Sequence, residues 1–283
     1  MTTRPLTGRA PRLKTPPGTC DTHMHFYDKR FPMLPGTPSP AEASVEDYRK
    51  LMAWLGIERV AAVQPNAYGE DNTLLMEAVA ELGPCARAVV VVKPSVTDAE
   101  LDRLHKGGAR SFRCMALHGG TLGLDELDAV AARVVPFGWH ANVQLDGRQF
   151  PDYEAQLSRL PVPFVIDHVG KFLEPVATDD AAFKSLLRLV DTGNCWVKLS
   201  AAYETSKTGA PDYDDVGQLA KALVRAAPER MLWASNWPHA QADKLGYPDD
   251  PGLLDLLLDW APDEQTRTKI LATNPAELYG FAD

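Results

Sequence analysis

The amino-acid sequence predicts a single-domain α/β protein folded as a (β/α)8 TIM barrel, and three observations favour this fold. Eight short apolar runs, several of them rich in valine, recur about 20 to 40 residues apart, which is typical of parallel strands covered on both faces. A stretch with helix-start residues follows each run. The first run lacks the glycine-rich phosphate turn of a doubly wound open sheet, which is the alternative. Eight strand–helix units therefore predict a closed barrel.

The elements follow one another along the whole chain. The candidate strands span residues 18–26, 58–64, 86–93, 109–115, 139–146, 162–169, 195–200 and 231–236. Ser44 opens the first predicted helix, and Thr97 with Glu100 three residues later forms a capping box. Pro251 stands at a first helical position. Aspartates occupy the other expected helix starts, at Asp71, Asp125, Asp152, Asp179 and Asp212.

The two ends of the chain are expected to lie against the barrel. Residues 1–17 are rich in proline, arginine and threonine and predict a tail that wraps the outside of the fold or frays. Residues 18–283 are predicted to form the barrel domain. Within it, residues 262–280 predict a last helix plus a short cap against the outside of the barrel.

Composition narrows the class of protein. The 283 residues include 29 basic and 38 acidic side chains, a net charge of −9, which disfavours nucleic acid and anionic membranes as partners. A small anionic molecule remains a suitable ligand. The four cysteines form no C-x-x-C pair, so neither a disulfide framework nor a thiolate zinc site is expected. Because we find no long apolar run and no signal-peptide pattern, we expect a cytoplasmic enzyme. The oligomeric state stays open.

Polar side chains gather where the candidate strands end, and barrel enzymes carry their active sites at that end. Asp21, His23 and His25 are spaced by two residues, so they are expected to point together into the barrel mouth. His168 ends the sixth strand and Asn236 ends the eighth. The further candidates for substrate binding are Gln64, Arg113, Gln144, Lys171, Lys198, Tyr203 and His239.

Other basic residues are less informative. We expect His105, within a helical pattern, and His140, at a strand start, to be structural, and leave His118 open. Lys93 and Lys198 either line the pocket or extend outward along their aliphatic stems. Arginine suits bidentate carboxylate binding. We therefore expect one substrate carboxylate to bind within a set that consists of Lys93, Arg113, Lys171 and Lys198.

Three strings, in this order, resemble the amidohydrolase superfamily. They are Asp21-Thr22-His23-Met24-His25-Phe26, Ile166-Asp167-His168 and Ser235-Asn236-Trp237-Pro238-His239. The chain is similar in particular, over about residues 18–281, to the branch that contains 2-pyrone-4,6-dicarboxylate lactonase and D-galactarolactone isomerase. The resemblance implies the barrel, a cytoplasmic catabolic role, and a lactone or related cyclic acid as substrate.

The resemblance also implies where a metal would bind. The usual ligands are an H-x-H pair after the first strand, Lys or Glu after the fourth, His after the fifth and sixth, and Asp after the eighth. This chain keeps three histidines, but the remaining positions hold Arg113, Gln144 and Asn236. Three imidazoles can hold Zn²⁺, yet the missing carboxylate and the arginine oppose a divalent cation. We predict no metal and no other cofactor, with zinc as the alternative.

Asn236 bears on the type of reaction. A neutral amide cannot take a proton from water, so hydrolysis lacks its expected base. A hydroxyl group of the substrate can instead attack the lactone carbonyl internally. His23, His25 and His168 are then expected to donate hydrogen bonds to the oxyanion, and Asn236 to bind the attacking or leaving hydroxyl. Together with the resemblance, this predicts an isomerase of a sugar-acid lactone, an aldaric acid lactone like D-galactarolactone.

Three other functions stay open. A lactone hydrolase of the 2-pyrone-4,6-dicarboxylate lactonase type would use His168 or His239 as its base. A zinc-dependent decarboxylase of the same superfamily is disfavoured by the amide at position 236. A binding protein without catalysis is the least favoured, because ligand binding alone does not require histidines clustered at strand ends.

Overall fold

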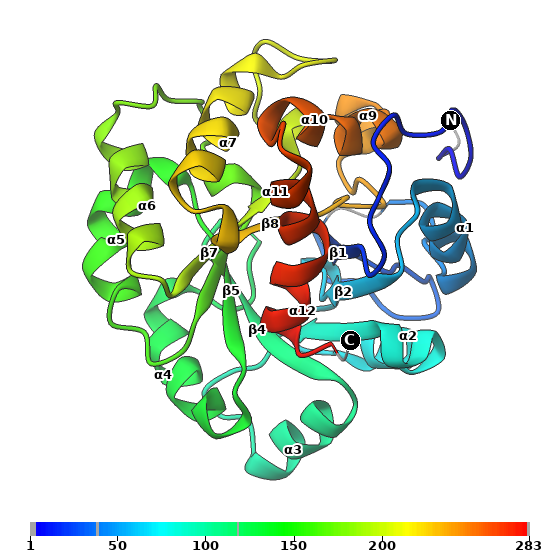
Figure 1. Ribbon diagram of the computed structural model, residues 1–283. Coiled ribbons are helices and arrows are strands. Elements are labelled where there is room, and N and C mark those ends of the chain that lie inside the picture. The colour runs from blue at the N-terminus through cyan, green and yellow to red at the C-terminus, as the bar shows by residue number, and fades with distance from the viewer. Residues whose placement is uncertain (1–3, 38–39, 118, 282–283) are drawn as a thin grey trace.

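The structure is a computed structural model that describes residues 4–37, 40–117 and 119–281. Eight parallel strands pair in chain order into one barrel with helices outside it (Figure 1). The predicted (β/α)8 barrel is confirmed, and each predicted run contains one strand. The strands are β1 (Cys20–Met24), β2 (Arg59–Val63), β3 (Ala86–Val90), β4 (Ala109–Met115), β5 (His140–Gln144), β6 (Phe164–Ile166), β7 (Cys195–Leu199) and β8 (Met231–Trp233).

Hydrogen bonds at the carboxyl end join the last strand to the first. The Thr22 hydroxyl donates to the carbonyl of Trp233 over 2.8 Å. The Asn236 N–H donates to the carbonyl of His23, also over 2.8 Å. The pairing of β1 with β2 shifts register between Asp21 and Met24. This irregularity breaks the alternation of side chains along β1 where its functional residues lie.

Helices cover the outside of the barrel and bury the outward-facing strand residues (Figure 1). The described ranges contain no helix with the length and apolar character needed to cross a membrane. The helices are α1 (Val45–Leu55), α2 (Thr73–Leu82), α3 (Asp98–Lys106), α4 (Leu124–Val134), α5 (Phe150–Leu157), α6 (Ala181–Asp191), α7 (Asp214–Ala226), α8 (Ala242–Leu245), α9 (Asp250–Asp255), α10 (Leu257–Trp260), α11 (Glu264–Thr268) and α12 (Asn274–Tyr279).

The helix starts are only partly as predicted. The Ser44 and Thr97 side chains each accept a backbone N–H of the first turn, so these two N-caps are confirmed. Asp125 and Asp152 instead lie inside the first turns of their helices. There they complement the positive end of the helix dipole without capping it. Asp180, one residue later than predicted, caps α6.

Residues 4–17 contain no helix or strand and run along the outside of the barrel beside α1 and α9 (Figure 1). Arg9 pairs with Asp255 over 2.9 Å, and the Leu13 N–H donates to the same carboxylate. The indole N–H of Trp54 donates to the Arg9 carbonyl. These contacts tie the tail to the first and ninth helices.

The C-terminal segment differs from its prediction. Residues 264–279 form α11, a π-helical turn (Lys269–Thr273) and α12. Tyr279 is fully buried, and with Phe281 it packs among inward-facing apolar residues of the barrel such as Val89 and Val165. The segment therefore closes the amino end of the barrel, because the apolar interior at that end needs a cover. The carboxyl end is left for the polar residues.

Candidate active site

A cavity of about 100 Å³ opens at the carboxyl ends of the strands. It contains five of the predicted site residues, which are His25, Arg113, Gln144, His168 and Asn236. Its remaining lining was not predicted and consists of Tyr27, Pro65, Asn66, Ala67, Met115, Glu204, Ala240 and Gln241. The cavity therefore gathers side chains from β4 and β5 and from the segments after β1, β2, β6, β7 and β8.

A second cavity of about 750 Å³ lies outside the barrel mouth, between the tail and the segments before α7 and α9. Tyr203 lines it, together with charged residues such as Arg9 and Asp249. The predicted histidines are not part of its lining. We place the reaction in the smaller cavity, because perturbed titratable groups converge there.

Arg113 forms one wall of the site cavity. Its guanidinium donates to the carbonyl of Gln64 over 2.9 Å and to the side-chain oxygen of Gln144 over 3.1 Å. Burial lowers the pKa of Arg113, and the nearby Asp167 opposes this effect. Its Nε–H has no hydrogen-bond partner, and within the described ranges no carboxylate forms an ion pair with Arg113. The structure thus provides a held, unpaired cation that suits a substrate carboxylate.

His23 and His25 lie at the floor of the cavity, and only His25 lines it. Their Nε2 atoms are 3.2 Å apart, and Nδ1 of His25 lies 2.8 Å from the carbonyl of Val63. Nδ1 of His25 must therefore carry the hydrogen, which leaves its Nε2 as an acceptor. Burial lowers the pKa of His25 to about 3, so this ring is neutral at pH 7.

Lys198 lies beneath His23 and is fully buried. Its ammonium is 3.1 Å from Nδ1 of His23 and 3.1 Å from Oδ1 of Asp167. Nδ1 of His23 also lies 3.3 Å from the same oxygen of Asp167, so this nitrogen either accepts from the ammonium or carries the hydrogen and donates to the carboxylate. Burial alone would raise the pKa of Asp167, but Lys198 and His23 hold it well below its ordinary value. Asn142 donates to the same carboxylate oxygen over 2.9 Å.

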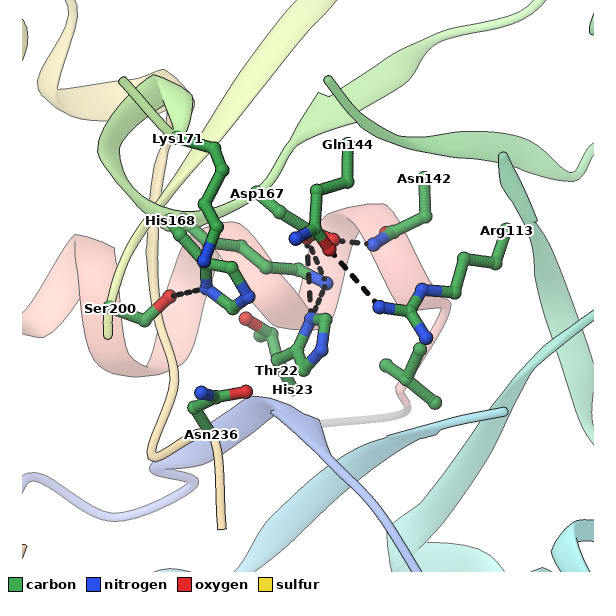
Figure 2. A network of polar contacts seen from close by, with 12 residues as sticks. Thr22, His23, Arg113, Asn142, Gln144, Asp167, His168, Lys171, Ser200 and Asn236 are labelled. Carbon is green, nitrogen blue, oxygen red and sulfur yellow. Dashed lines mark hydrogen bonds and ion pairs between the residues drawn. The ribbon is translucent and has the colours of Figure 1, made fainter. Parts of the chain in front are cut away.

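His168 stands beside this group, with its ring centroid 4.8 Å from that of His23. Its Nδ1 lies 2.9 Å from the hydroxyl of Ser200. Burial, followed by the neighbouring His23, lowers the pKa of His168 well below its ordinary value, so the ring is neutral. In Figure 2 the imidazoles lie between Arg113 on one side and Ser200 with Lys171 on the other. A neutral imidazole bonded at Nδ1 can exchange a proton at Nε2.

Asn236 is held by hydrogen bonds in one orientation. Its amide nitrogen donates to the hydroxyl of Tyr203 over 2.8 Å and to a carboxylate oxygen of Glu204 over 3.0 Å. Both amide hydrogens are thereby used, so Oδ1 is the polar atom that remains for a ligand. Lys171 pairs with the other oxygen of Glu204. The oxygen of Asn236 can therefore accept a hydrogen bond from a substrate hydroxyl.

His239 lies behind this amide instead of in the cavity. Its Nδ1 is 2.9 Å from the Tyr203 hydroxyl and its Nε2 is 2.9 Å from Asp250. Both ring nitrogens are engaged and the side chain is fully buried. The prediction that His239 binds substrate is therefore wrong. It orients Tyr203, which in turn orients Asn236, so Tyr203 also acts behind the cavity wall.

Four further predictions need correction. The side-chain amide of Gln64 donates to the main-chain carbonyls of Gly69 and Asp71 and so holds a loop. The main-chain carbonyl of Gln64 accepts a hydrogen bond from Arg113. Lys171 and Lys198 are buried in ion pairs behind the cavity surface, so neither contacts a ligand there directly. Lys93 pairs with Glu126 away from the cavity. Long side chains at strand ends can turn either way, and strand position alone does not decide which.

Asp21 was predicted to point into the barrel mouth together with His23 and His25, and this prediction is wrong. Its carboxylate accepts from the hydroxyl and N–H of Ser235, the N–H of His23 and the hydroxyl of Tyr48 on α1. The register shift after Asp21 explains the difference. Asp21 therefore joins β1 to the segment after β8 and to α1.

The remaining histidines follow the predictions as far as the structure describes them. His105 lies on α3 and accepts the indole N–H of Trp139 over 3.0 Å. His140 lies at the start of β5 and packs edge-on against Tyr279. Neither lines the site cavity. His118 lies outside the described residues.

Non-glycine residues with left-handed backbone concentrate at the reacting end of the barrel. Within the described ranges, seven of them belong to the loops after β6, β7 and β8. Tyr213 lies immediately before α7, and the other six lie nearer the strand ends, namely His168, Val169, Lys171, Ala201, Asn236 and His239. Left-handed conformations are costly for residues other than glycine, although asparagine tolerates them better than most. Two of the six line the cavity. The surrounding hydrogen bonds hold these backbones in place.

The donor set does not fit a divalent metal. Side-chain donor atoms of His23, Asp167 and His168 lie within 4.8 Å of one another. However, Lys198 already bonds both His23 and Asp167. A metal at Nε2 of His23 would require a hydrogen on its Nδ1, and Lys198 would then have to give up its contact with this nitrogen, while Asp167 could accept that hydrogen. Two buried cations, Lys198 and Arg113, would also oppose the added charge.

The buried histidines predict a pH-dependent stability. The pKa values of His25 and His140 are lowered to about 3 by burial, so the unfolded chain binds protons below pH 6.5 that the folded chain does not. Their stabilising effect is therefore complete above about pH 6.5 and is lost as the pH falls toward 3. We expect each to lower the free energy of unfolding by up to about 1.4 kcal/mol per pH unit. Urea titrations between pH 7 and 4.5 would measure this.

The variant His140→Gln supplies the control for that experiment. His140 lies far from the cavity and its Nε2 has no hydrogen-bond partner, so the variant removes one titrating group without changing the site. The pH slope of its unfolding free energy should be smaller than that of the unaltered protein by about one proton. Equal slopes would show that His140 is protonated in the folded protein.

Sequence reasoning missed two important carboxylates. Asp167 lies two residues after Val165, which points into the barrel from β6, so strand alternation places Asp167 on the same side. It also belongs to the string Ile166-Asp167-His168, so the sequence did indicate it. Glu204 lies in a 3-10 turn (Ala202–Glu204) after β7. No strand periodicity extends into that turn. The only signal was a carboxylate next to Tyr203.

The chain is similar to known proteins over nearly its whole length. A family model described as amidohydrolase matches residues 20–281. D-galactarolactone isomerase from Agrobacterium fabrum (strain C58) is 40% identical over 280 residues, which cover 98% of this chain and 96% of that protein. 2-Pyrone-4,6-dicarboxylate hydrolase from Comamonas testosteroni is 32% identical over 282 residues, covering 95% and 92%.

A solved structure shows the same fold. An apo crystal structure of a protein from Agrobacterium tumefaciens has a TM-score of 0.94 to this fold at 40% identity, and the match covers 99% of each chain. The predicted resemblance is confirmed by the family match and by both curated relatives. The chain therefore belongs to the amidohydrolase family.

Proposed function

We propose that the protein is a lactone isomerase that converts one lactone of a hydroxylated sugar diacid into another without a metal ion. The observation that carries this proposal is Asn236, an amide whose oxygen is directed to the ligand by Tyr203 and Glu204. It can orient a substrate hydroxyl but cannot deprotonate water. The similarity to D-galactarolactone isomerase supports the same reaction.

In this mechanism Arg113 binds the substrate carboxylate and fixes the lactone carbonyl above His25. Asn236 orients the attacking hydroxyl, whose proton passes to Nε2 of His168 as its oxygen bonds to the carbonyl carbon. The oxyanion forms in the positive field of Arg113 and of Lys198. The old ring C–O bond then breaks, and His168 returns the proton to the departing oxygen. No proton is gained or lost overall, so one shuttling group suffices.

A second candidate function is lactone hydrolysis, favoured by the neutral His168 as a base and by the similarity to 2-pyrone-4,6-dicarboxylate hydrolase. NMR of the enzyme with galactarolactone separates the two reactions. Isomerisation yields a second lactone before open diacid rises above the uncatalysed rate. If open diacid forms as fast as any new lactone, the hydrolase takes the place of the isomerase.

We expect activity to be independent of divalent metal. Because Lys198 and Arg113 crowd the donor set with positive charge, prolonged chelation followed by desalting should leave the isomerisation rate unchanged. Elemental analysis of the same sample should give much less than one equivalent of zinc per chain. Loss of activity on chelation, restored by stoichiometric Zn²⁺, would refute the metal-free mechanism.

Substitution of Arg113 tests carboxylate binding. Arg113→Met should raise KM by about 10- to 150-fold, which corresponds to about 1.5–3 kcal/mol for a charge-assisted hydrogen bond. Arg113→Lys retains the charge but loses the paired donors, so its increase in KM should be smaller. Steady-state kinetics on a carboxylate-bearing lactone would measure both. Unchanged KM in Arg113→Met would remove Arg113 from the binding site.

A further inference from the structure

The two sides of the site cavity carry different charges. Arg113 presents a cation that has no ion-pair partner within the described ranges. Glu204 lines another part of the cavity and presents a carboxylate. Its partner Lys171 is only 5% exposed and is not part of the lining. A ligand therefore meets the negative member of this pair first.

Glu204 is ionised at neutral pH. Burial alone would raise its pKa, but Lys171 and His168 lower the pKa to about 2. One carboxylate oxygen pairs with Lys171 and the other accepts from the amide of Asn236. The lining on this part of the cavity thus includes two acceptors, which are the Glu204 carboxylate and the free oxygen of Asn236. Such a surface suits hydroxyl donors and repels an anion.

We infer that Glu204 restricts the substrate to lactones that carry a single carboxylate, bound by Arg113, and hydroxyl groups elsewhere on the ring. A second carboxylate that reached this wall would face a like charge in a buried site, which is an effective means of rejecting a ligand. The pair also explains why a buried lysine adds no second anion site, since Glu204 satisfies Lys171. This inference rests on the proposed lactone chemistry but concerns the selection of substrate.

Binding of two matched ligands tests the inference without any turnover. 2-Pyrone-6-carboxylate and 2-pyrone-4,6-dicarboxylate differ only in the second carboxylate, and calorimetry gives both Kd values. The unaltered protein should bind the monocarboxylate about tenfold or more tightly than the dicarboxylate. In Glu204→Gln that preference should fall at least about tenfold, because the repulsion is gone and Lys171 becomes available.

Two further variants make the result specific. Glu204→Asp keeps the charge and should keep the preference. Lys171→Met combined with Glu204→Gln leaves no unpaired charge at this wall. The ratio of the two Kd values should therefore lie near one, because no unpaired Lys171 is present to attract the second carboxylate. This double variant also decides the matter if Glu204→Gln alone does not fold, since it buries no orphaned lysine.

The inference is overturned if the unaltered protein binds both ligands equally, or if the preference survives in a folded variant that has no carboxylate at position 204. Failure of the proposed function looks different. In that case galactarolactone would not isomerise, whatever the ratio of the two Kd values.

Discussion

His168→Asn is expected to lower kcat for isomerisation by about 10²–10⁴-fold, the usual contribution of a positioned general acid–base. The imidazole is neutral, is oriented by Ser200 and lines the cavity, and asparagine cannot accept the proton. Asparagine tolerates the left-handed backbone at this position, where φ is 56°. The loop should therefore keep its shape, and KM should change little because Arg113 still binds the carboxylate.

The matched control is His239→Asn. His239 also has left-handed backbone, with φ of 62°, but its ring nitrogens bond Tyr203 and Asp250. Its loss acts only through the orientation of Asn236, so we expect a much smaller decrease in kcat than for His168→Asn. A His168→Asn enzyme that retains nearly full kcat would exclude His168 as the proton carrier.

Asn236→Asp is expected to reduce isomerisation about 10²-fold without an equal gain in hydrolysis. The amide nitrogen lies 3.0 Å from Glu204, so a carboxylate there meets a like charge. Two carboxylates this close share a proton, and the pKa of the new one rises. The protonated group cannot deprotonate water. It also has one hydrogen where the amide donates two, to Tyr203 and to Glu204, so its oxygen is held less firmly toward the substrate. NMR progress curves would give both rates.

Adding Glu204→Gln to Asn236→Asp should release the hydrolytic activity. Without its charged neighbour, Asp at position 236 ionises at neutral pH and can act as a base toward water. The measured ratio of open diacid to isomerised lactone should therefore rise in the double variant relative to both single variants. If Asn236→Asp alone already hydrolyses the lactone efficiently, then Glu204 does not control the protonation of that position.

The barrel was predictable because its signal is repeated eight times. Parallel strands buried on both faces produce short apolar runs, many of them containing valine, and each of the eight runs contains a strand. Helix starts were harder, because aspartate stabilises the first turn both as a cap and within it, as at Asp125. The C-terminal segment was misplaced because its apolar residues give no indication of which apolar surface they cover.

The site was predictable where a side chain directly follows strand periodicity. Arg113 and Gln144 lie where β4 and β5 pair in continuous register, and both line the cavity. Prediction failed where the backbone departs from that period, as at the bulge after Asp21 and at the turn that carries Glu204. It also failed for lysines, because the partner that neutralises a lysine is a tertiary contact and leaves no local pattern.

The left-handed backbones of the last three loops bear on how this enzyme can change by mutation. At Ala201, whose φ is 52°, glycine would relieve the conformational cost, so selection for heat resistance alone would favour it. At His168 and Asn236 the same exchange would relieve the backbone but remove the reacting group and its hydrogen bonds. Positions at the same end of the barrel thus differ in their tolerance to mutation: Ala201 can be replaced without loss of a reacting group, whereas His168 and Asn236 cannot. Variant libraries should leave the cavity-lining positions fixed and explore their strained neighbours.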